Sequence, residues 1–207
     1  LLTALFVYYA IYYGFGWQAL LRGFVVPNGW PSGSWSVAVE VHFYLLFPLL
    51  LALQRRIGVA ALVACLVAAL ALRTVLFLKS GEVQVLGYWT IVGRFDQFVL
   101  GMIFFHAGRS VLVRRHARAI LAFAIMLGAL AWHAFNRAGG YAHMPSYPSP
   151  SPLWIVLPTL EGLGYAALIA AYDNLPGDGR SRVGSVLAHV GEVSYSIYLL
   201  HFLLILE

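Results

Sequence analysis

Long apolar segments alternate with short polar stretches along the chain. The apolar segments cover approximately residues 1–21, 35–53, 57–78, 87–107, 119–135, 153–172 and 192 to the end. Most are close to 20 residues, the length that an α-helix needs to cross a hydrocarbon layer of about 30 Å. The alternating apolar and polar positions of a membrane barrel are absent. The pattern predicts an all-α fold, a polytopic transmembrane helix bundle with about seven spans in this chain.

Composition agrees with a membrane protein. Hydrophobic residues make up 61% of the chain and charged residues only 10%, whereas a soluble domain is roughly 25% charged. The one cysteine, Cys65, lies in an apolar segment, so a disulfide framework and a cysteine-based metal site are not expected. No internal repeat is visible, and we predict one transmembrane domain over residues 1–207. The chain starts without Met and ends inside an apolar segment, so we expect it to be truncated at both ends.

Basic residues favour one orientation. They gather after segments 35–53, 87–107 and 153–172, whereas each alternate loop carries a single basic residue. The richer loops contain Arg55, Arg56, Arg109, Arg114, Arg115, Arg118, Arg180 and Arg182. Because cytoplasmic loops carry an excess of Lys and Arg, these loops are predicted to be cytoplasmic. The same bias accounts for the net charge of +5.

Segment 35–53 carries polar groups where lipid is expected. Ser36, Glu40 and Tyr44 are spaced four residues apart and share one helix face. Glu40 lies roughly 8 Å inside the span, at 1.5 Å of rise per residue. An ionisable group at such a depth is costly unless it faces the bundle or water. We expect Glu40 either to bond a buried cation, to line a polar cavity or to act in catalysis.

Segment 87–107 offers a cation at a similar depth. Arg94, Gln97 and Gly101 share one face of the predicted helix, and Asp96 faces away from it. An ion pair between Glu40 and Arg94 would offset the desolvation of both groups, so we predict this pair. It fits a structural role and a substrate site equally.

The last apolar segment places Ser194, Tyr198 and His201 on one face. His201 falls near the middle of the membrane, where a neutral imidazole is tolerated and can relay protons. An interhelical hydrogen bond is the structural alternative. Glu161, in segment 153–172, is a further buried acid without a predicted role.

The arginines of the cytoplasmic loops fit two roles. They act as topology signals, or they hold a phosphorylated cofactor, because Arg contacts phosphate in a planar, bidentate way. The candidates for phosphate binding are Arg109, Arg115, Arg118 and Arg182. The chain lacks a Walker-type glycine loop, a dinucleotide fingerprint, HExxH and GxSxG. No metal is expected, and the surface of a nucleic-acid binder is absent.

Three stretches together resemble the membrane-bound acyltransferase 3 family. "SWSVAVEVHFYLLFPLL" (34–50) resembles its W-S-L-A-V-E-x-x-F-Y-L-L-x-P-L-L signature. "GRFDQFVLGMIFF" (93–105) is similar to its R-F-x-x-F-x-x-G-M segment, and "VGEVSYSIYLLHFLLI" (190–205) to its G-x-x-S-Y-S-L-Y-L-L-H segment. They occur in the family's order and spacing. The family's E-E-Q-F-Y is Glu40-Val41-His42-Phe43-Tyr44 here, and its proposed catalytic histidine, on the first span, has no counterpart.

The resemblance implies an integral O-acyltransferase of the bacterial cytoplasmic membrane. It would move an acyl group, typically acetyl, from acyl-CoA to a hydroxyl of a sugar, glycan or glycolipid, in contact with membrane lipid. Glu40 and His201 would support catalysis. Ser36, Tyr44, Arg94, Ser194 and Tyr198 would bind substrate, and the four loop arginines named above would bind acyl-CoA. Without the base, this segment alone is expected to be inactive.

Two other functions remain open from the residues alone. A secondary transporter or flippase could use Glu40, Arg94 and His201 as a substrate or proton path, since buried charges and helices broken by Pro and Gly fit that class. Inverted repeats would favour it, and none is found. A membrane scaffold without catalysis is the third possibility.

Overall fold

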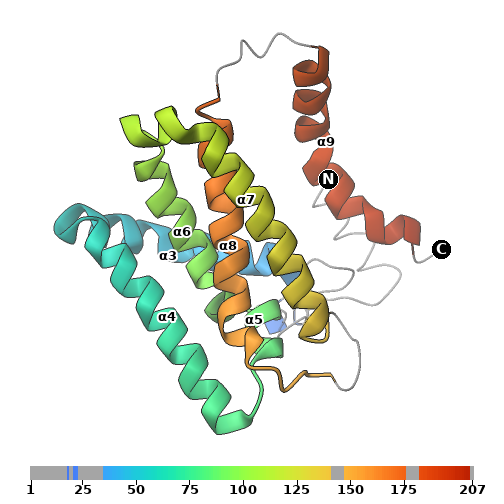
Figure 1. Cartoon of the computed structure of the whole chain (residues 1–207). Coiled ribbons are helices and arrows are strands. Elements are labelled where there is room, and N and C mark those ends of the chain that lie inside the picture. The colour runs from blue at the N-terminus through green and yellow to red at the C-terminus, as the bar shows by residue number, and fades with distance from the viewer. Residues whose placement is uncertain (1–17, 19–20, 23–34, 141–146, 176–181, 206–207) are drawn as a thin grey trace. The chain divides into compact units, whose positions relative to one another are not determined.

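The computed structural model describes residues 18, 21–22, 35–140, 147–175 and 182–205. Regular structure in these residues is entirely helical, which confirms the all-α prediction. The helices are α3 (Trp35–Ile57), α4 (Val59–Ser80), α5 (Gln84–Trp89), α6 (Ile91–Ala107), α7 (Val111–Arg137), α8 (Leu153–Tyr172) and α9 (Arg182–Ile205), as Figure 1 shows. The chain divides into two units. One runs from Val39 to Leu175, and the other contains α9 and the first turn of α3.

Four of the described helices, α3, α4, α7 and α8, are long and apolar enough to cross a membrane. The bounds of α3, α4 and α8 agree closely with predicted spans, and α8 begins and ends where the sequence pattern does, whereas α7 begins eight residues before its predicted span. The predicted span 1–21 lies outside the described residues except for Gln18, Leu21 and Arg22. The prediction of about seven spans therefore compares with four candidates in the described part of the chain.

Three boundaries differ from the predictions. Segment 87–107 is two helices, because Thr90 is extended (φ −126°, ψ 156°) and its Oγ1 accepts the Gly93 N–H to cap α6. Segment 109–118 is helical rather than a loop, because Ser110 caps α7 in the same way and the helix continues through a non-helical residue, His116. The stretch before residue 192 is also helical, and α9 begins at Arg182.

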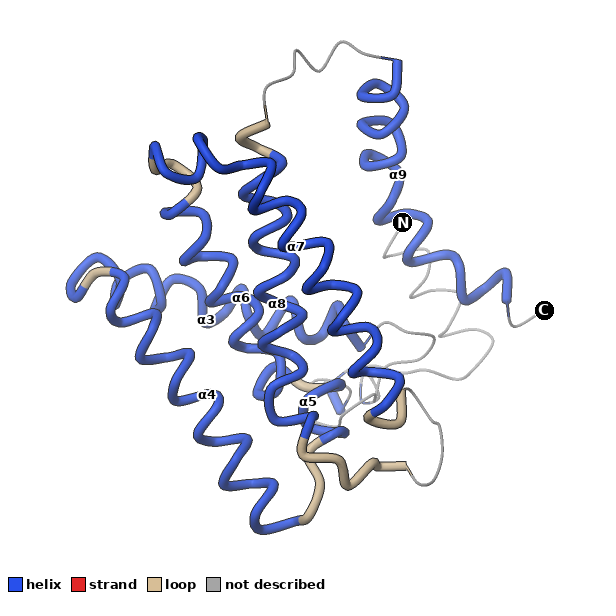
Figure 2. Tube along the Cα trace, in the orientation of Figure 1, coloured by secondary structure: helices blue, strands red, loops and turns tan. Residues whose placement is uncertain are grey.

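The unit Val39–Leu175 contains four helices that lie side by side, namely α4, α6, α7 and α8. Helix α8 packs between α6 and α7 (Figure 2). Helix α3 crosses behind them and packs against α4 and α6 through a core of five buried residues. These are Phe43, Leu50, Leu62, Val99 and Met102. A second core, around Trp154 and Phe135, joins α7 to α8 at the opposite end. We call the end where α3 and α6 finish and α7 begins the basic end, because Arg55 and Arg56 in the last turn of α3 and Arg109 after α6 lie there.

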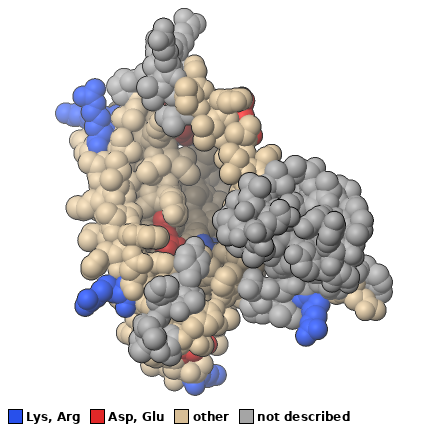
Figure 3. Space-filling view, turned by 90° about the vertical axis from the view of Figure 1, so that its right-hand side faces the viewer, with Lys and Arg blue, Asp and Glu red and all other residues tan. Residues whose placement is uncertain are grey.

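The outward faces of this unit are apolar. Val67 and Leu78 of α4, and Ile125 and Leu130 of α7, are more than half exposed. On the left-hand side of Figure 3, Lys and Arg side chains stand above and below a broad uncharged surface. A soluble monomer rarely exposes so large an apolar area, whereas such a surface matches lipid. The molecule is therefore a membrane protein.

Helices α6 and α8 lie very close together at Gly162. A Cβ atom added there would lie 2.8 Å from the Gln97 Cα atom and 3.0 Å from its Cγ atom. Real Cβ atoms do not come within 3.0 Å of a neighbouring atom, so a side chain at position 162 would push the backbones of α6 and α8 apart. The missing side chain at Gly162 thus sets the distance between the two helices.

We expect Gly162→Ala to destabilise the protein, because overpacking a close helix contact costs about 1–3 kcal/mol. The matched control is Gly128→Ala on α7, where an added Cβ meets nothing within 4 Å. The control should be neutral or stabilising, since Ala favours a helix over Gly by up to about 1 kcal/mol. Thermal unfolding of the purified protein in detergent measures both. Equal midpoints for the two variants would contradict the tight contact.

Candidate functional site

A buried ion pair joins α4 to α6. The Arg73 and Asp96 side chains are both 0% exposed, and Arg73 Nη2 lies 2.5 Å from Asp96 Oδ2. Arg73 Nη1 also donates to Asp96 Oδ1 at 3.3 Å, so the guanidinium meets the carboxylate through both terminal nitrogens. Each charge makes the other tolerable inside an apolar bundle, where an unpaired charge would be very costly.

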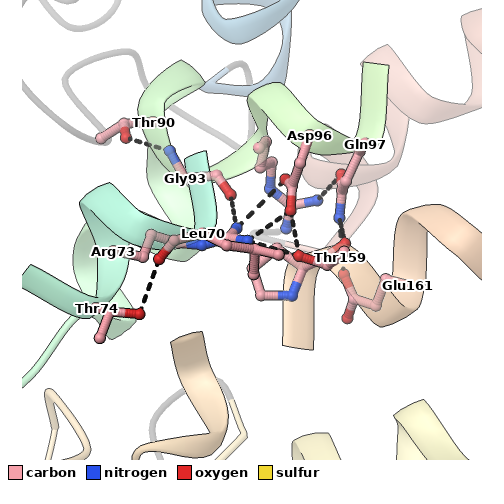
Figure 4. Close-up of polar contacts among 11 residues, drawn as sticks. Leu70, Arg73, Thr74, Thr90, Gly93, Asp96, Gln97, Thr159 and Glu161 are labelled. Carbon is pink, nitrogen blue, oxygen red and sulfur yellow. Dashed lines mark hydrogen bonds and ion pairs between the residues drawn. The ribbon is translucent and has the colours of Figure 1, made fainter. Parts of the chain in front are cut away.

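Two further groups complete this network (Figure 4). Arg73 Nη1 donates to the Gly93 carbonyl oxygen at 2.6 Å, and Arg73 Nη2 donates to Thr159 Oγ1 on α8 at 2.6 Å. The Thr159 hydroxyl in turn donates to Asp96 Oδ2. The network therefore fastens three helices at one depth. Arg73 Nε is buried and finds no hydrogen-bond partner among the described residues.

Sequence reasoning missed Arg73 and gave Asp96 no partner. The signal was present, since Arg73 lies about two turns from the end of an otherwise apolar helix. An arginine at that depth needs a partner on another helix. The sequence did not say which of several acids would supply it.

A second polar chain runs from α6 to α8. Arg94 Nη1 donates to Gln97 Oε1 at 3.2 Å, and Gln97 Nε2 donates to Glu161 Oε2 at 3.2 Å. The Gln97 amide also donates to the Pro158 carbonyl oxygen at 3.1 Å. A neutral amide thus bridges a cation and a carboxylate, and all three side chains are only half-buried. Glu161, which had no predicted role, belongs to this group.

The predicted Glu40–Arg94 ion pair is wrong. The Arg94 guanidinium lies over the Tyr88 ring, 4.7 Å from its centroid, and its Nε donates to the Tyr88 carbonyl oxygen at 2.8 Å. Its link to an acid passes through Gln97 to Glu161. Glu40 is half-buried on α3 and forms no ion pair within the described part of the chain. Similar depth alone did not determine which acid and cation meet, because two other acids, on α6 and α8, lie nearer to the arginines.

In the unit that contains α9, the structure brings two of the other predicted residues together. Ser36 Oγ on the first turn of α3 hydrogen bonds the Tyr198 hydroxyl on α9. Ser194 is exposed, and its hydroxyl donates to the Gly191 carbonyl oxygen at 2.7 Å. The His201 side chain lies outside the described residues.

Tyr44, in the other unit, is 63% exposed. The structure therefore does not join it to the buried networks of α6. Its predicted role in substrate binding stays a prediction.

A cavity of about 350 Å³ opens at the basic end, between the end of α6, the start of α7 and the end of α8. Arg109 and Arg114 provide its positive charge, and Asp173 and Asn174 are its other polar groups. The rest of its wall is apolar and includes Phe104, Phe105 and Ile169. The Asn174 amide is fixed by bonds to the Gly108 and Ala170 carbonyl oxygens.

The predicted phosphate-binding arginines fall in different places. Arg109 lines the cavity, with its guanidinium 4.5 Å from the Phe105 ring centroid. Arg114, which was not among the candidates, lines it too. Arg115 and Arg118 are exposed on α7 and do not line this cavity. The Arg182 side chain is outside the described part of the chain.

This arrangement fits a ligand with an anionic part and an apolar part. Two arginines can hold phosphate by charge-assisted bonds, which are stronger than neutral ones. The apolar wall beyond them would receive a hydrophobic group. Among the described side chains, no group of three or more His, Cys, Asp or Glu could hold a metal ion.

One comparison with known proteins gives a match. A family model described as an acyltransferase domain matches residues 1–206. No curated protein and no solved structure matches the chain. The match covers nearly the whole chain and so includes both units.

Asp96→Leu and Arg73→Met should each destabilise the protein by about 3–5 kcal/mol, because each leaves the other charge buried and unpaired. The double variant Arg73→Met/Asp96→Leu should recover much of that loss, since apolar side chains of similar volume replace the pair. Lys79→Met, on the exposed end of α4, is the control and should change little. Thermal unfolding in detergent measures all four. A double variant as unstable as the sum of the singles would contradict the pairing.

Proposed function

The chain belongs to the acyltransferase 3 family of membrane proteins. We therefore propose that it is part of an O-acyltransferase of the bacterial cytoplasmic membrane. The donor is acyl-CoA, bound from the cytoplasmic side. The acceptor is a hydroxyl of a sugar in a cell-envelope glycan or glycolipid. The observation that carries this proposal is the cavity at the basic end, which combines two arginines with an apolar wall.

The reaction transfers one acyl group and one proton. The acceptor oxygen attacks the thioester carbonyl carbon, an ester C–O bond forms and the C–S bond breaks. A base takes the hydroxyl proton, and the thiol of CoA leaves after protonation. The family's histidine base has no counterpart in this chain, so Glu40 and His201 are assigned supporting roles here.

The donor's phosphates would lie at the mouth of the cavity. Arg109 and Arg114 supply positive charge there, and guanidinium groups suit the planar contacts of phosphate. The Asp173 carboxylate would repel an anion, so the phosphates are expected on the side of the two arginines. The thioester would then point toward the apolar wall formed by Phe104 and Ile169.

The acceptor would bind toward the opposite end of the bundle. Arg94, Gln97 and Glu161 form a half-buried polar chain there that can donate to and accept from sugar hydroxyls. Tyr44, in the same unit, is a further proposed acceptor contact. Ser36, Ser194 and Tyr198 belong to the other unit, and their role in substrate binding stays a prediction.

The test is acyl transfer from radiolabelled acyl-CoA to glycan or glycolipid, by membranes that carry the full-length protein. We expect label in the acceptor fraction, and none when the membranes lack the protein. Arg109→Ala and Arg114→Ala should each raise the KM for acyl-CoA about tenfold or more, because a charge-assisted bond contributes about 1.5–3 kcal/mol. Neither change should lower kcat to the same extent.

Arg115→Ala and Arg118→Ala, on α7 like Arg114, are the matched controls, since both side chains are exposed and do not line the cavity. Their KM values should stay within about twofold, as expected of surface charges. Equal effects of all four substitutions would place the phosphates along the surface of α7 instead. Absence of label in every acceptor fraction would refute the transferase.

A further inference from the structure

A second cavity, of about 550 Å³, lies between α3 and α6 in the same unit. Its walls are mainly aromatic, with Phe47 on α3 facing Phe98 and Phe105 on α6. Polar residues occur only at the basic end, where Gln54, Arg55 and His106 form its rim. The Gln54 and His106 side chains bond each other there, so this rim joins the two helices. We call this cavity the aromatic groove.

The aromatic groove and the arginine cavity share a wall. Gly101 and Phe105 line both of them. These residues are four apart on α6 and therefore lie one above the other on the same face. Gly101 is exposed, and an added Cβ would meet nothing within 4 Å. The missing side chain leaves open space beside the wall that the two cavities share.

The aromatic groove runs along α3 and α6, away from its rim at the basic end. From His106 back to Phe98 is eight residues, which is about 12 Å of helix. At that depth the rings of Phe43 and Phe98 stack, with centroids 4.1 Å apart. Both rings line the groove at the end far from the rim, and Phe43 is buried, so we take the stacked pair as the floor of the groove.

We propose that the aromatic groove holds the acyl chain of the donor, and that the preferred donor therefore carries a chain of several methylenes rather than acetyl. This inference rests on the proposed function. Charge complementarity selects this occupant, because the anionic head has Arg109 and Arg114 in the adjoining cavity and the chain has only apolar walls beyond Gly101. An acetyl group would leave an aromatic space of about 550 Å³ almost unfilled.

The experiment measures the KM of the full-length protein in membranes for acyl-CoA donors from acetyl to dodecanoyl. Each methylene that enters the groove should lower KM by up to about fourfold, the ratio that corresponds to about 0.8 kcal/mol per buried methylene. The gain should stop once the chain reaches the floor. Phe98→Leu removes part of the floor and should move that limit to longer chains.

Gly101→Leu should fill the space between the two cavities and reduce the ratio of acetyl to octanoyl KM at least tenfold. Gly128→Leu is the matched control, because its Cβ also has open space and α7 lines neither the groove nor its junction there. It should keep the wild-type ratio. Thermal unfolding of each variant confirms that it is folded, so a changed ratio reports the groove.

A KM that is independent of chain length, with acetyl transfer that still depends on Arg109, would overturn the inference and leave the proposed function intact. Failure of every acyl-CoA to serve as donor would remove the proposed function itself. Phospholipid that copurifies with the wild type but not with Gly101→Leu, together with a flat chain-length series, would identify a membrane lipid tail as the occupant and also overturn the inference.

Discussion

The bundle depends on placing two full charges where water does not reach. Arg73 and Asp96 are completely buried, and each is tolerable only because the other is present. The Thr159 hydroxyl accepts a hydrogen bond from Arg73 and donates one to Asp96, so α8 also contacts the ion pair. An ion pair of this kind adds little net stability compared with apolar side chains, but it penalises every other arrangement of the three helices. It therefore fixes how α4, α6 and α8 meet.

Helix α6 connects this anchor to the rest of the site. One of its faces holds Asp96 against α4, and another holds Gln97 against α8, with Arg94 hydrogen bonded to Gln97. Its basic end contributes Gly101 and Phe105 to both cavities. The missing side chain at Gly162 lets α8 lie against the backbone of Gln97. Helix α6 thus carries part of the buried ion pair and part of the wall of both cavities.

Much of the fold follows from the sequence pattern. Apolar length predicts the spans, and the bounds of α8 come directly from the polar residues that flank Leu153–Tyr172. Short-range capping was harder to foresee, because Thr90 and Ser110 look like ordinary residues in a span and a loop until their hydroxyls are seen to cap α6 and α7. Helical periodicity placed Arg94 and Gln97 on one face, where they are hydrogen bonded. Partner choice across helices was not predictable, since Glu40, Asp96 and Glu161 all lie inside spans and only packing decides which of them meets an arginine.

The break between α5 and α6 gives Arg94 a second task. At Thr90 the backbone leaves the helical path, and the carbonyl oxygen of Tyr88 accepts the Arg94 side chain at 2.8 Å. The Arg94 side chain thus gives the Tyr88 carbonyl oxygen a hydrogen-bond donor, and its guanidinium lies over the Tyr88 ring. Arg94 acts as a brace for the helix junction as well as a cation for any substrate nearby. A lysine at position 94 would keep the charge but lack the planar guanidinium that makes both the hydrogen bond to the Tyr88 carbonyl and the contact with the Tyr88 ring.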